Sequence, residues 1–273
     1  MSELPEAILL GIVQGLTEFL PISSTGHLVL FQEAIGVSED EFGLGFDAAM
    51  HLGTLAAVLI YFRLRLIALS LALAGSIRVR RWDASSDSRL AWFLAIATVP
   101  AAVFGALLED SAAETFRSPE VVAVMLIVFS IPMFLAEMFP RGVRRSDGFT
   151  LRDALSIGFA QSVALIPGVS RSGMTISTGM IRGFSRTEAA SVAFLLSVPI
   201  IAAAGGKQLF DLALASDATG QSWAIYAVGL LTAAVVGYVT IAMLMRFLRL
   251  NSLRIFVAYR LALGILLIAM VIP

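Results

Sequence analysis

The sequence predicts an all-α polytopic membrane protein whose two halves form an inverted-topology repeat. Hydrophobic residues make up 58% of the 273 residues and charged residues only 14%, whereas ordinary globular proteins are roughly 25% charged. Several apolar runs approach the ~20 residues that cross a bilayer core. A polar motif near the N-terminus also recurs at an offset of 147 residues, which places Gly11 on Gly158 and Gln14 on Gln161.

Composition excludes several other classes. The net charge is −1, and no basic stripe with interleaved aromatic residues is present, so we expect no nucleic-acid partner. The absence of cysteine excludes disulfides and thiol chemistry and leaves the compartment undecided. The N-terminus opens with Glu3 and Glu6 and lacks a basic region, which predicts that there is no cleavable signal peptide.

The first half is predicted to begin with a broken helical segment. Residues 4–35 are apolar but interrupted at Pro21 and Gly26, which indicates a re-entrant helical pair. The rest of this half is interpreted, in chain order, as an acidic loop at 38–42, a span at about 44–62, a surface-lying helix and basic loop within 66–89, and spans at about 90–108 and 120–139.

The second half repeats this plan. Residues 151–182 contain the second broken segment. Apolar runs then predict spans at about 187–207, 223–246 and 255–272.

The charge of the loops predicts the orientation, because Lys and Arg are biased towards cytoplasmic loops. The inside loops are expected to be the basic ones, 63–89, 140–150 and 247–254. The outside loops are expected to be the acidic or nearly acidic ones, 36–43, 109–119 and 208–222.

Each half therefore has three crossings and one re-entrant pair, which gives six transmembrane helices in a single membrane domain, 1–273. Three is odd, so repeat 1 (about 4–139) and repeat 2 (about 151–272) point in opposite directions. The first broken segment enters from outside and the second from inside. Such segments meet near the bilayer midplane, where proteins of this kind place their binding sites.

The first motif runs from Gln14 to His27 and carries an amide, a carboxylate, four hydroxyls and an imidazole. Pro21 and Gly26 break the helix on either side of its hydroxyl cluster. A broken helix exposes backbone N–H groups, which form an anion cradle beside the hydroxyls of Ser23, Ser24 and Thr25. The alternative is a simple capped helix start.

The second motif lacks the acid and the imidazole but carries Arg171. A planar guanidinium matches phosphate oxygens. Around it we expect hydroxyl donors at Ser170, Ser172 and Thr175, and close backbone approach at Gly168 and Gly173. The halves thus share a backbone pattern but divide the chemistry, as two facing half-sites would. The alternative is a purely structural ion pair between Glu18 and Arg171.

Gln14 and Glu18 lie four residues apart and share one helix face. Two oxygen-bearing side chains on one face suit a hard divalent cation, Mg²⁺ or Ca²⁺. Three candidates remain open for the nucleophile: Ser24 activated by His27, His27 itself, or a water activated by His27 or Glu18.

Four further ionisable residues have weaker interpretations. Asp47 and His51 lie one turn apart at the outer end of the first span, either as a carboxylate–imidazole pair supporting the site or as a polar pair at the interface. Glu137 and Arg260 lie near span ends and are interpreted as snorkelling or paired groups.

The motifs resemble the undecaprenyl-diphosphate phosphatase family of bacterial inner membranes, also known as bacitracin-resistance proteins. The resemblance is carried by (Glu/Gln)-x-x-x-Glu at 14–18, Ser-Ser-Thr-Gly-His at 23–27 and Pro-Gly-x-Ser-Arg-Ser-x-x-Thr at 167–175. By length and hydropathy it covers the whole chain. The sequence departs from many relatives at Gln14, where they have Glu and where a neutral amide attracts a metal less strongly.

The resemblance implies hydrolysis of the terminal phosphate of undecaprenyl diphosphate, which regenerates the monophosphate carrier for cell-wall synthesis. It also implies a divalent cation and a site that opens to the periplasm. The expected partners are the lipid substrate and the bilayer, and a homodimer stays open. The alternative function is a secondary transporter or lipid-carrier flippase for a phosphorylated substrate, which the topology alone would favour.

The predicted site has three parts. The catalytic residues are expected to be Glu18, Ser24, His27 and Arg171. The metal ligands are expected to be Gln14 and Glu18. Substrate binding is assigned to Ser23, Thr25, Gly26, Gly168, Ser170, Ser172, Gly173 and Thr175.

Overall fold

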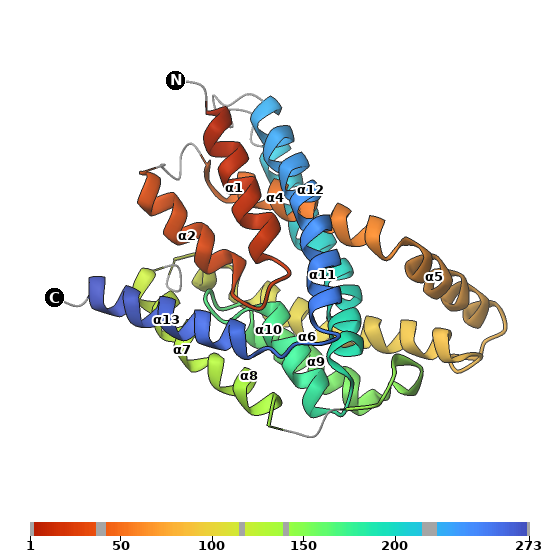
Figure 1. The fold of residues 1–273 in the computed structure, drawn as a ribbon. Coiled ribbons are helices and arrows are strands. Elements are labelled where there is room, and N and C mark those ends of the chain that lie inside the picture. Colours follow the sequence, from red (N-terminus) through yellow and green to blue (C-terminus); the bar gives the residue numbers. More distant parts are fainter. Residues whose placement is uncertain (1–2, 37–41, 115–117, 139–141, 215–222, 272–273) are drawn as a thin grey trace.

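The computed structural model describes residues 3–36, 42–114, 118–138, 142–214 and 223–271, which are almost entirely helical (Figure 1). The first half contains α1 (Leu4–Thr17), α2 (Ser24–Ile35), α4 (Leu44–Tyr61), α5 (Arg63–Arg78), α6 (Ser86–Glu114), α7 (Pro119–Val128) and α8 (Ser130–Ala136). A short 3-10 turn, η1 (Ser146–Gly148), leads into α9 (Leu151–Val163), α10 (Arg171–Ile181), α11 (Arg186–Leu214), α12 (Trp223–Phe247) and α13 (Arg254–Val271).

Helix breaks are present in both predicted segments, between α1 and α2 and between α9 and α10. The interruption predicted at Gly26 was wrong, because α2 begins at Ser24 and continues through Gly26. Each break contains a proline, Pro21 or Pro167, which has no backbone N–H to continue a helix. Each break also contains a serine with positive φ, 77° at Ser23 and 75° at Ser170. These two serines occupy equivalent positions of the sequence repeat, and positive φ is uncommon for any residue other than glycine. The repeat is therefore visible in the backbone as well as in the sequence.

The two halves exchange packing partners. The first helix of each broken pair packs on a helix of the other half, α1 on α12 and α9 on α6. Glycines at equivalent positions allow this close approach. A Cβ atom on Gly11 would lie 2.8 Å from the Gly229 carbonyl oxygen, and one on Gly158 would lie 2.5 Å from the Ala97 carbonyl oxygen.

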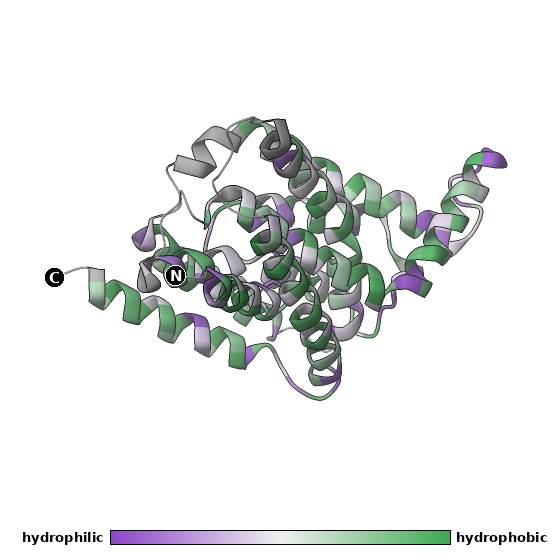
Figure 2. Cartoon of the chain, turned by 90° about the horizontal axis from the view of Figure 1, so that it is seen from above, coloured by the Kyte–Doolittle hydropathy of each residue, from purple (hydrophilic) through white to green (hydrophobic). Residues whose placement is uncertain are grey.

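The structure is that of a multi-pass membrane protein. Within the described ranges, four helical segments are long and apolar enough to cross a bilayer: Ser86–Leu107, Pro119–Ala136, Arg186–Gln208 and Trp223–Phe247. The number rises to five if α4 and α5, which are bent by 81° at their junction, together form one span. Figure 2 shows mainly hydrophobic helices, with hydrophilic residues gathered where α5 gives way to α6.

Two helices extend further than predicted. α6 continues to Glu114, into the segment interpreted as an acidic loop at 109–119, and α11 continues to Leu214, into the predicted loop at 208–222. The acidic loop predicted at 38–42 lies outside the described residues except for Phe42. The loop assignments at 109–114 and 208–214 were therefore wrong, because acidic side chains are compatible with a helix that has left the apolar layer.

The second broken pair is tied together at its base by Asp153, whose side chain is fully buried at the start of α9. Its carboxylate accepts hydrogen bonds from Arg144 Nη2 at 2.7 Å and from Arg182 Nε at 2.7 Å. It also accepts from the Thr150 backbone N–H at 2.9 Å, which completes a capping box. One carboxylate thus joins the beginning of α9, the end of α10 and the preceding loop.

The structure separates the interpretations of Glu137 and Arg260. Glu137 is paired, as expected: its carboxylate accepts from Arg186 Nε at 2.9 Å and from the Leu253 N–H at 2.7 Å. Arg260 is fully buried, so the snorkelling interpretation is wrong for it. Its Nη2 instead donates to the Gly168 carbonyl oxygen at 2.9 Å.

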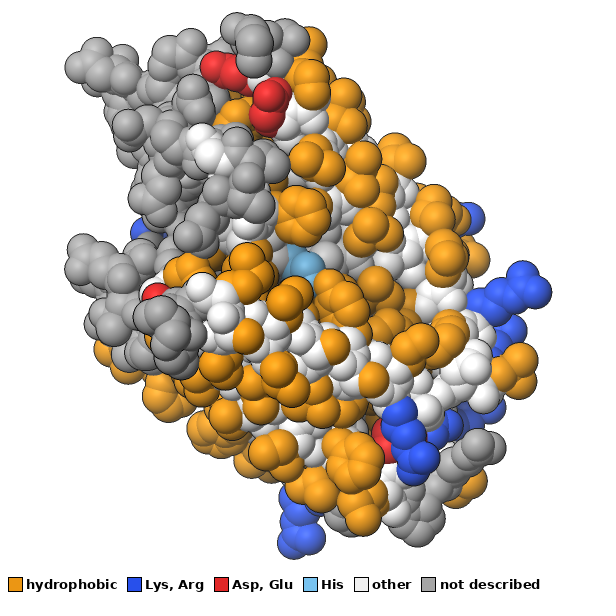
Figure 3. Space-filling view, turned by 60° about the vertical axis from the view of Figure 1, so that its left-hand side comes forward, with side chains coloured by type: hydrophobic (Ala, Val, Ile, Leu, Met, Phe, Trp, Pro, Cys, Tyr) orange, Lys and Arg blue, Asp and Glu red, His pale blue; other side chains and the backbone are white. Residues whose placement is uncertain are grey.

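Charge is unevenly distributed over the molecular surface. In Figure 3 the visible face is largely hydrophobic across its middle, with Lys and Arg side chains towards the bottom and right and acidic side chains mostly towards the top. A broad apolar band between charged ends suits a protein surrounded by lipid.

Candidate active site

The two breaks meet in the interior of the molecule. The Gly168 N–H donates to Ser23 Oγ at 3.1 Å, and Ser172 Oγ donates to the Leu20 carbonyl oxygen at 3.1 Å. The first bond joins the two breaks directly, and the second joins the first break to the first turn of α10. The prediction that the two tips lie in contact is therefore confirmed, although they are separated by more than a hundred residues in the chain.

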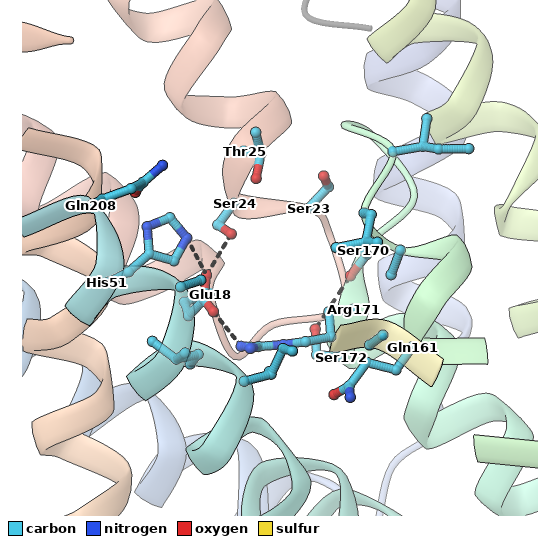
Figure 4. Close-up of a pocket in the computed structure, with 18 residues that line it drawn as sticks. Glu18, Ser23, Ser24, Thr25, His51, Gln161, Ser170, Arg171, Ser172 and Gln208 are labelled. Atoms are coloured by element: carbon cyan, nitrogen blue, oxygen red, sulfur yellow. Dashed lines mark hydrogen bonds and ion pairs between the residues drawn. The ribbon is translucent and has the colours of Figure 1, made fainter. Parts of the chain in front are cut away.

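Glu18 is the centre of the resulting polar cluster (Figure 4). Its carboxylate forms an ion pair with Arg171 and accepts a hydrogen bond from Ser24 Oγ at 2.5 Å. It also accepts from Gln14 Nε2 at 3.0 Å. His51 Nε2 lies 3.6 Å from the same carboxylate oxygen that Ser24 contacts. Acid, hydroxyl, guanidinium and imidazole groups are thus brought together from four separate helical elements or breaks.

A cavity of about 240 Å³ opens beside this cluster. Its lining is divided between polar and apolar residues. The polar part consists of Glu18, Ser23, Ser24, Thr25, His51, Gln161, Ser170, Arg171, Ser172 and Gln208, and the apolar part of Ala101, Ala164, Leu165, Ile166, Ile200, Ile201, Ala204 and Gly205.

The backbone positions most of these side chains. Ser24 begins α2 and Arg171 begins α10, so both helix N-termini point to the cluster. Ser170 Oγ caps α10 by accepting from the Gly173 N–H at 3.1 Å, and it lies 3.2 Å from Ser172 Oγ. Helix N-termini and hydroxyl groups together favour an anion. The site therefore combines one carboxylate with several groups that attract negative charge.

The structure changes the position expected for His27. Its Nδ1 lies 2.7 Å from the Ser23 carbonyl oxygen and its Nε2 lies 2.7 Å from the Tyr259 hydroxyl, on which the ring also stacks. Both ring nitrogens are therefore engaged, and His27 does not line the cavity. The pairing of His27 with Ser24 was wrong in geometry, because Ser24 donates to Glu18 instead.

Four of the residues assigned to substrate binding also lie outside the cavity lining. Thr175 Oγ1 donates to the Arg171 carbonyl oxygen at 2.7 Å, within its own helix. Gly26 and Gly168 pack against Val122, and Gly173 packs under Ser170 and Met133. These three glycines provide room for the breaks to pack, whereas Ser23, Thr25, Ser170 and Ser172 do reach the cavity.

Three polar residues that line the cavity, His51, Gln161 and Gln208, were not among the predicted site residues. His51 was considered only with Asp47, but its Nδ1 lies 2.7 Å from the Asp47 backbone oxygen rather than from the carboxylate. The Asp47 carboxylate accepts from Gln32 at 3.2 Å. Gln161 had a usable signal, since it is the repeat equivalent of Gln14.

The oxygen atoms of the cluster fit a hard divalent cation. The amide oxygen of Gln14 is buried and has no hydrogen-bond partner among the described residues, and it belongs to a side chain that contacts the Glu18 carboxylate. The part of the chain that the structure describes has no cluster of three or more His, Cys, Asp or Glu residues that could hold a metal. Mg²⁺ is commonly held by one or two carboxylates together with substrate phosphates, so Glu18 and the amide oxygen of Gln14 are the groups that would hold such a cation.

Comparison with known proteins identifies the family. A family profile described as "Bacitracin resistance protein BacA" matches residues 7–266. The undecaprenyl-diphosphatase of Rubrobacter xylanophilus is 46% identical over 272 residues, which cover 100% of both chains. Those of Desulforudis audaxviator and Hahella chejuensis are 43% and 44% identical over 266 and 261 residues, covering 96% and 95% of each chain. The chain therefore belongs to the bacitracin resistance protein BacA family.

Proposed function

We propose that this membrane protein removes the terminal phosphate of undecaprenyl diphosphate, giving undecaprenyl phosphate and inorganic phosphate. The observation that carries the proposal is the contact of Ser24 and Arg171 with the same carboxylate, Glu18, in a cavity lined by both polar and apolar residues. Relatives that match along the full chain are named for this activity. The product is the monophosphate carrier lipid that cell-wall synthesis reuses.

Ser24 is the nucleophile in this proposal. Its hydroxyl donates to Glu18 at 2.5 Å, so the carboxylate is placed to accept the proton as Ser24 Oγ attacks the terminal phosphorus. The bond from that phosphorus to the bridging oxygen breaks, and undecaprenyl phosphate leaves with the proton returned by Glu18. Water then attacks the phosphoserine while Glu18 takes a proton from the water and gives it back to Ser24, which releases phosphate.

Charge on the phosphate oxygens is neutralised by the second half of the molecule. Arg171 is half-buried at the start of α10, and Ser170 and Ser172 line the cavity beside it. Thr25 and the N-terminal ends of α2 and α10 complete this surface. Preorganised donors in a site with little water stabilise phosphoryl transfer more strongly than the same donors in bulk water.

A divalent cation, Mg²⁺ or Ca²⁺, completes the site in this proposal, held by Glu18 and Gln14. When bound, it would supply positive charge to the phosphate oxygens. Gln14→Glu should lower the concentration of cation required, because it adds a negative charge at an oxygen site.

The surroundings of the site extend the proposal to its membrane context. The chain would cross the bacterial inner membrane six times as an inverted repeat, with the tips near the midplane and the cavity open to the periplasm. The exchanged packing of α1 on α12 and of α9 on α6 supports the repeat, and the uneven charge in Figure 3 supports a fixed orientation. The apolar part of the cavity lining, including Ile200 and Ile201, suits the first isoprene units of the lipid.

The test is phosphate release by the purified protein in detergent, with farnesyl diphosphate and Mg²⁺. Ser24→Ala and Glu18→Gln should each lower kcat by about 10²-fold to 10⁴-fold, as expected for loss of a nucleophile or a general base. Rapid quenching with substrate labelled at the terminal phosphate should trap acid-stable phosphoserine in the wild type and none in Ser24→Ala. The exposed Asp83→Asn provides the control.

Two results would contradict the proposal. A wild-type protein that releases no phosphate, but moves a phosphorylated lipid between leaflets of a vesicle, would favour the transporter alternative. Acid-labile, base-stable label on the wild type would place the phosphate on a histidine instead of Ser24.

A further inference from the structure

Gln161 is buried, and its side-chain amide forms no hydrogen bond with the described part of the protein. It lies on α9 and is 2% exposed. Neither Nε2 nor Oε1 has a hydrogen-bond partner among the described residues. Buried polar groups are almost always paired, and an unpaired amide costs stability. An unpaired amide at this position is explained if its hydrogen-bond partner is a bound molecule and not part of the protein.

The internal repeat explains how the amide became unpaired. Gln14 is the equivalent residue of the first half, and its Nε2 donates at 3.0 Å to Glu18, four residues further along. In the second half the residue four positions after Gln161 is Leu165, which cannot accept a hydrogen bond. The second half therefore retains the glutamine without the carboxylate that satisfies it in the first half.

Gln161 also lines the cavity that holds Glu18 and Arg171. In Figure 4, Gln161 and Glu18 lie on opposite sides of Arg171. Ser24 lies on the Glu18 side, since its hydroxyl contacts that carboxylate. A diphosphate whose terminal phosphorus faces Ser24 and whose oxygens contact Arg171 would extend its second phosphate towards Gln161.

We propose that Gln161 binds the phosphate that stays on the lipid, with Nε2 donating to a non-bridging oxygen of that phosphate. This inference rests on the proposed function and assigns the two phosphates of the substrate to different halves of the repeat. Ser24 and Glu18, from the first half, act on the terminal phosphate. Gln161, from the second half, holds the leaving monophosphate, and Arg171 lies between them.

The assignment distinguishes the two products. Prenyl monophosphate occupies the Gln161 position, whereas inorganic phosphate occupies the position next to Ser24. Gln161→Met has similar length and removes both amide atoms. It should raise KM for farnesyl diphosphate by about tenfold or more, because a hydrogen bond to a charged group is lost. The inhibition constant of farnesyl monophosphate should rise by the same factor, while that of inorganic phosphate should stay unchanged.

Gln161→Met should weaken substrate binding but should not lower the stability of the protein. Replacing an unpaired buried amide with an apolar side chain of similar size removes a desolvation cost, so the Tm of Gln161→Met in detergent should equal or exceed that of the wild type. Ser177→Ala is the matched control. Ser177 is 1% exposed, its hydroxyl also has no partner among the described residues, and it does not line the cavity. It should gain stability without any change in KM or inhibition.

Gln161→Asn is the second variant to measure if Gln161→Met does not fold. Its side chain is one methylene shorter, so it should raise both the KM for farnesyl diphosphate and the inhibition constant of farnesyl monophosphate. Unchanged KM and unchanged inhibition in an active, folded variant would overturn the inference alone. Weaker inhibition by inorganic phosphate would also overturn it, because Gln161 would then contact the terminal phosphate. A wild type that releases no phosphate would overturn the proposed function and, with it, this assignment.

Discussion

At the scale of single residues, the structure reverses the roles that the sequence suggested for the two histidines, His27 and His51. His27 lies three residues from Ser24 in the chain, which favoured a catalytic pair. The structure instead engages both of its ring nitrogens with Ser23 and Tyr259, while His51, from a different helix, approaches Glu18. Proximity in sequence is a poor guide here because Ser24 begins a helix whose first hydroxyl points across the break.

The histidines should therefore respond differently to substitution. His27→Gln should lower the Tm by about 2–4 °C. It removes the hydrogen bond to Tyr259, which is worth about 1 kcal/mol, and in a chain of this size 1 kcal/mol corresponds to such a shift. Tyr259→Phe removes the same hydrogen bond from its other end and should reproduce this shift. His51→Gln should keep the wild-type Tm and lower kcat by about tenfold, through the loss of a contact with a charged group.

Thermal unfolding and steady-state phosphate release, measured on the same preparations, separate the two roles. A His27→Gln protein with wild-type Tm and strongly reduced kcat would return His27 to the catalytic apparatus. Glu18 and Arg171, which the structure brings into one ion pair, stood out in the sequence because an ionisable group inside an apolar segment is costly and rarely accidental. Gln161 carries no charge, so its burial has no comparable cost by which the sequence could single it out.

At the scale of helices, the sequence predicted the breaks more accurately than the helix ends. Proline and the repeated glycines locate a break to within a few residues. The ends of α6 and α11 were placed too early because acidic residues there were taken as loop. Both extensions contain residues that favour helix, Ala112, Ala113 and Glu114 in α6 and Leu212, Ala213 and Leu214 in α11.

The base of the second broken pair gives a prediction about pH. Burial by itself raises the pKa of Asp153, but the hydrogen bonds from Arg144, Thr150 and Arg182 outweigh it and lower the pKa to about 2. Asp153 lies outside the candidate spans. An acid whose pKa is lowered in the folded state adds stability above its unfolded value of 3.8, and this stability is lost as the pH falls through about 2. The shift corresponds to roughly 2 kcal/mol.

Asp153→Asn should therefore destabilise the protein near neutral pH by about 3 kcal/mol, since it leaves two arginines without their buried partner. The difference in Tm between the variant and the wild type should narrow as the pH is lowered from 4 towards 2. Asp83→Asn, which removes only an exposed pair with Arg81 at 3.7 Å, should change the Tm little at any pH. A constant difference between Asp153→Asn and the wild type across this range would show that the Asp153 charge does not contribute.

At the scale of the whole molecule, the site is asymmetric although its two breaks share a backbone feature, a serine with positive φ. The two halves place equivalent glycines and serines at the junction, as the offset of 147 residues predicted, and each break has its own proline at a position shifted by one residue. Their side chains differ there, because only the first half keeps a carboxylate and only the second an arginine. The number of crossings was harder to predict, since α4 and α5 bend by 81° and a hydropathy profile does not detect a bend.

The orientation of the chain can be tested cleanly because it contains no cysteine. Glu120 at the start of α7 and Arg80 after α5 are both exposed, and one predicted crossing, α6, separates them. In intact cells, a membrane-impermeant maleimide should label Glu120→Cys, and it should label Arg80→Cys only after permeabilisation. Arg145→Cys, which follows the next crossing, should behave like Arg80→Cys, and the unmodified chain should give no signal.

The same reagent reports on the opening of the cavity. Thr25 is half-buried and lines it, so Thr25→Cys should react from outside, and saturating farnesyl diphosphate should slow the reaction by occupying the cavity. Labelling of Glu120→Cys and Arg80→Cys from the same side would contradict a crossing by α6. Labelling of Thr25→Cys only after permeabilisation would mean that the cavity opens to the cytoplasm, on the side opposite to the one that the lipid diphosphate released by cell-wall synthesis is expected to occupy.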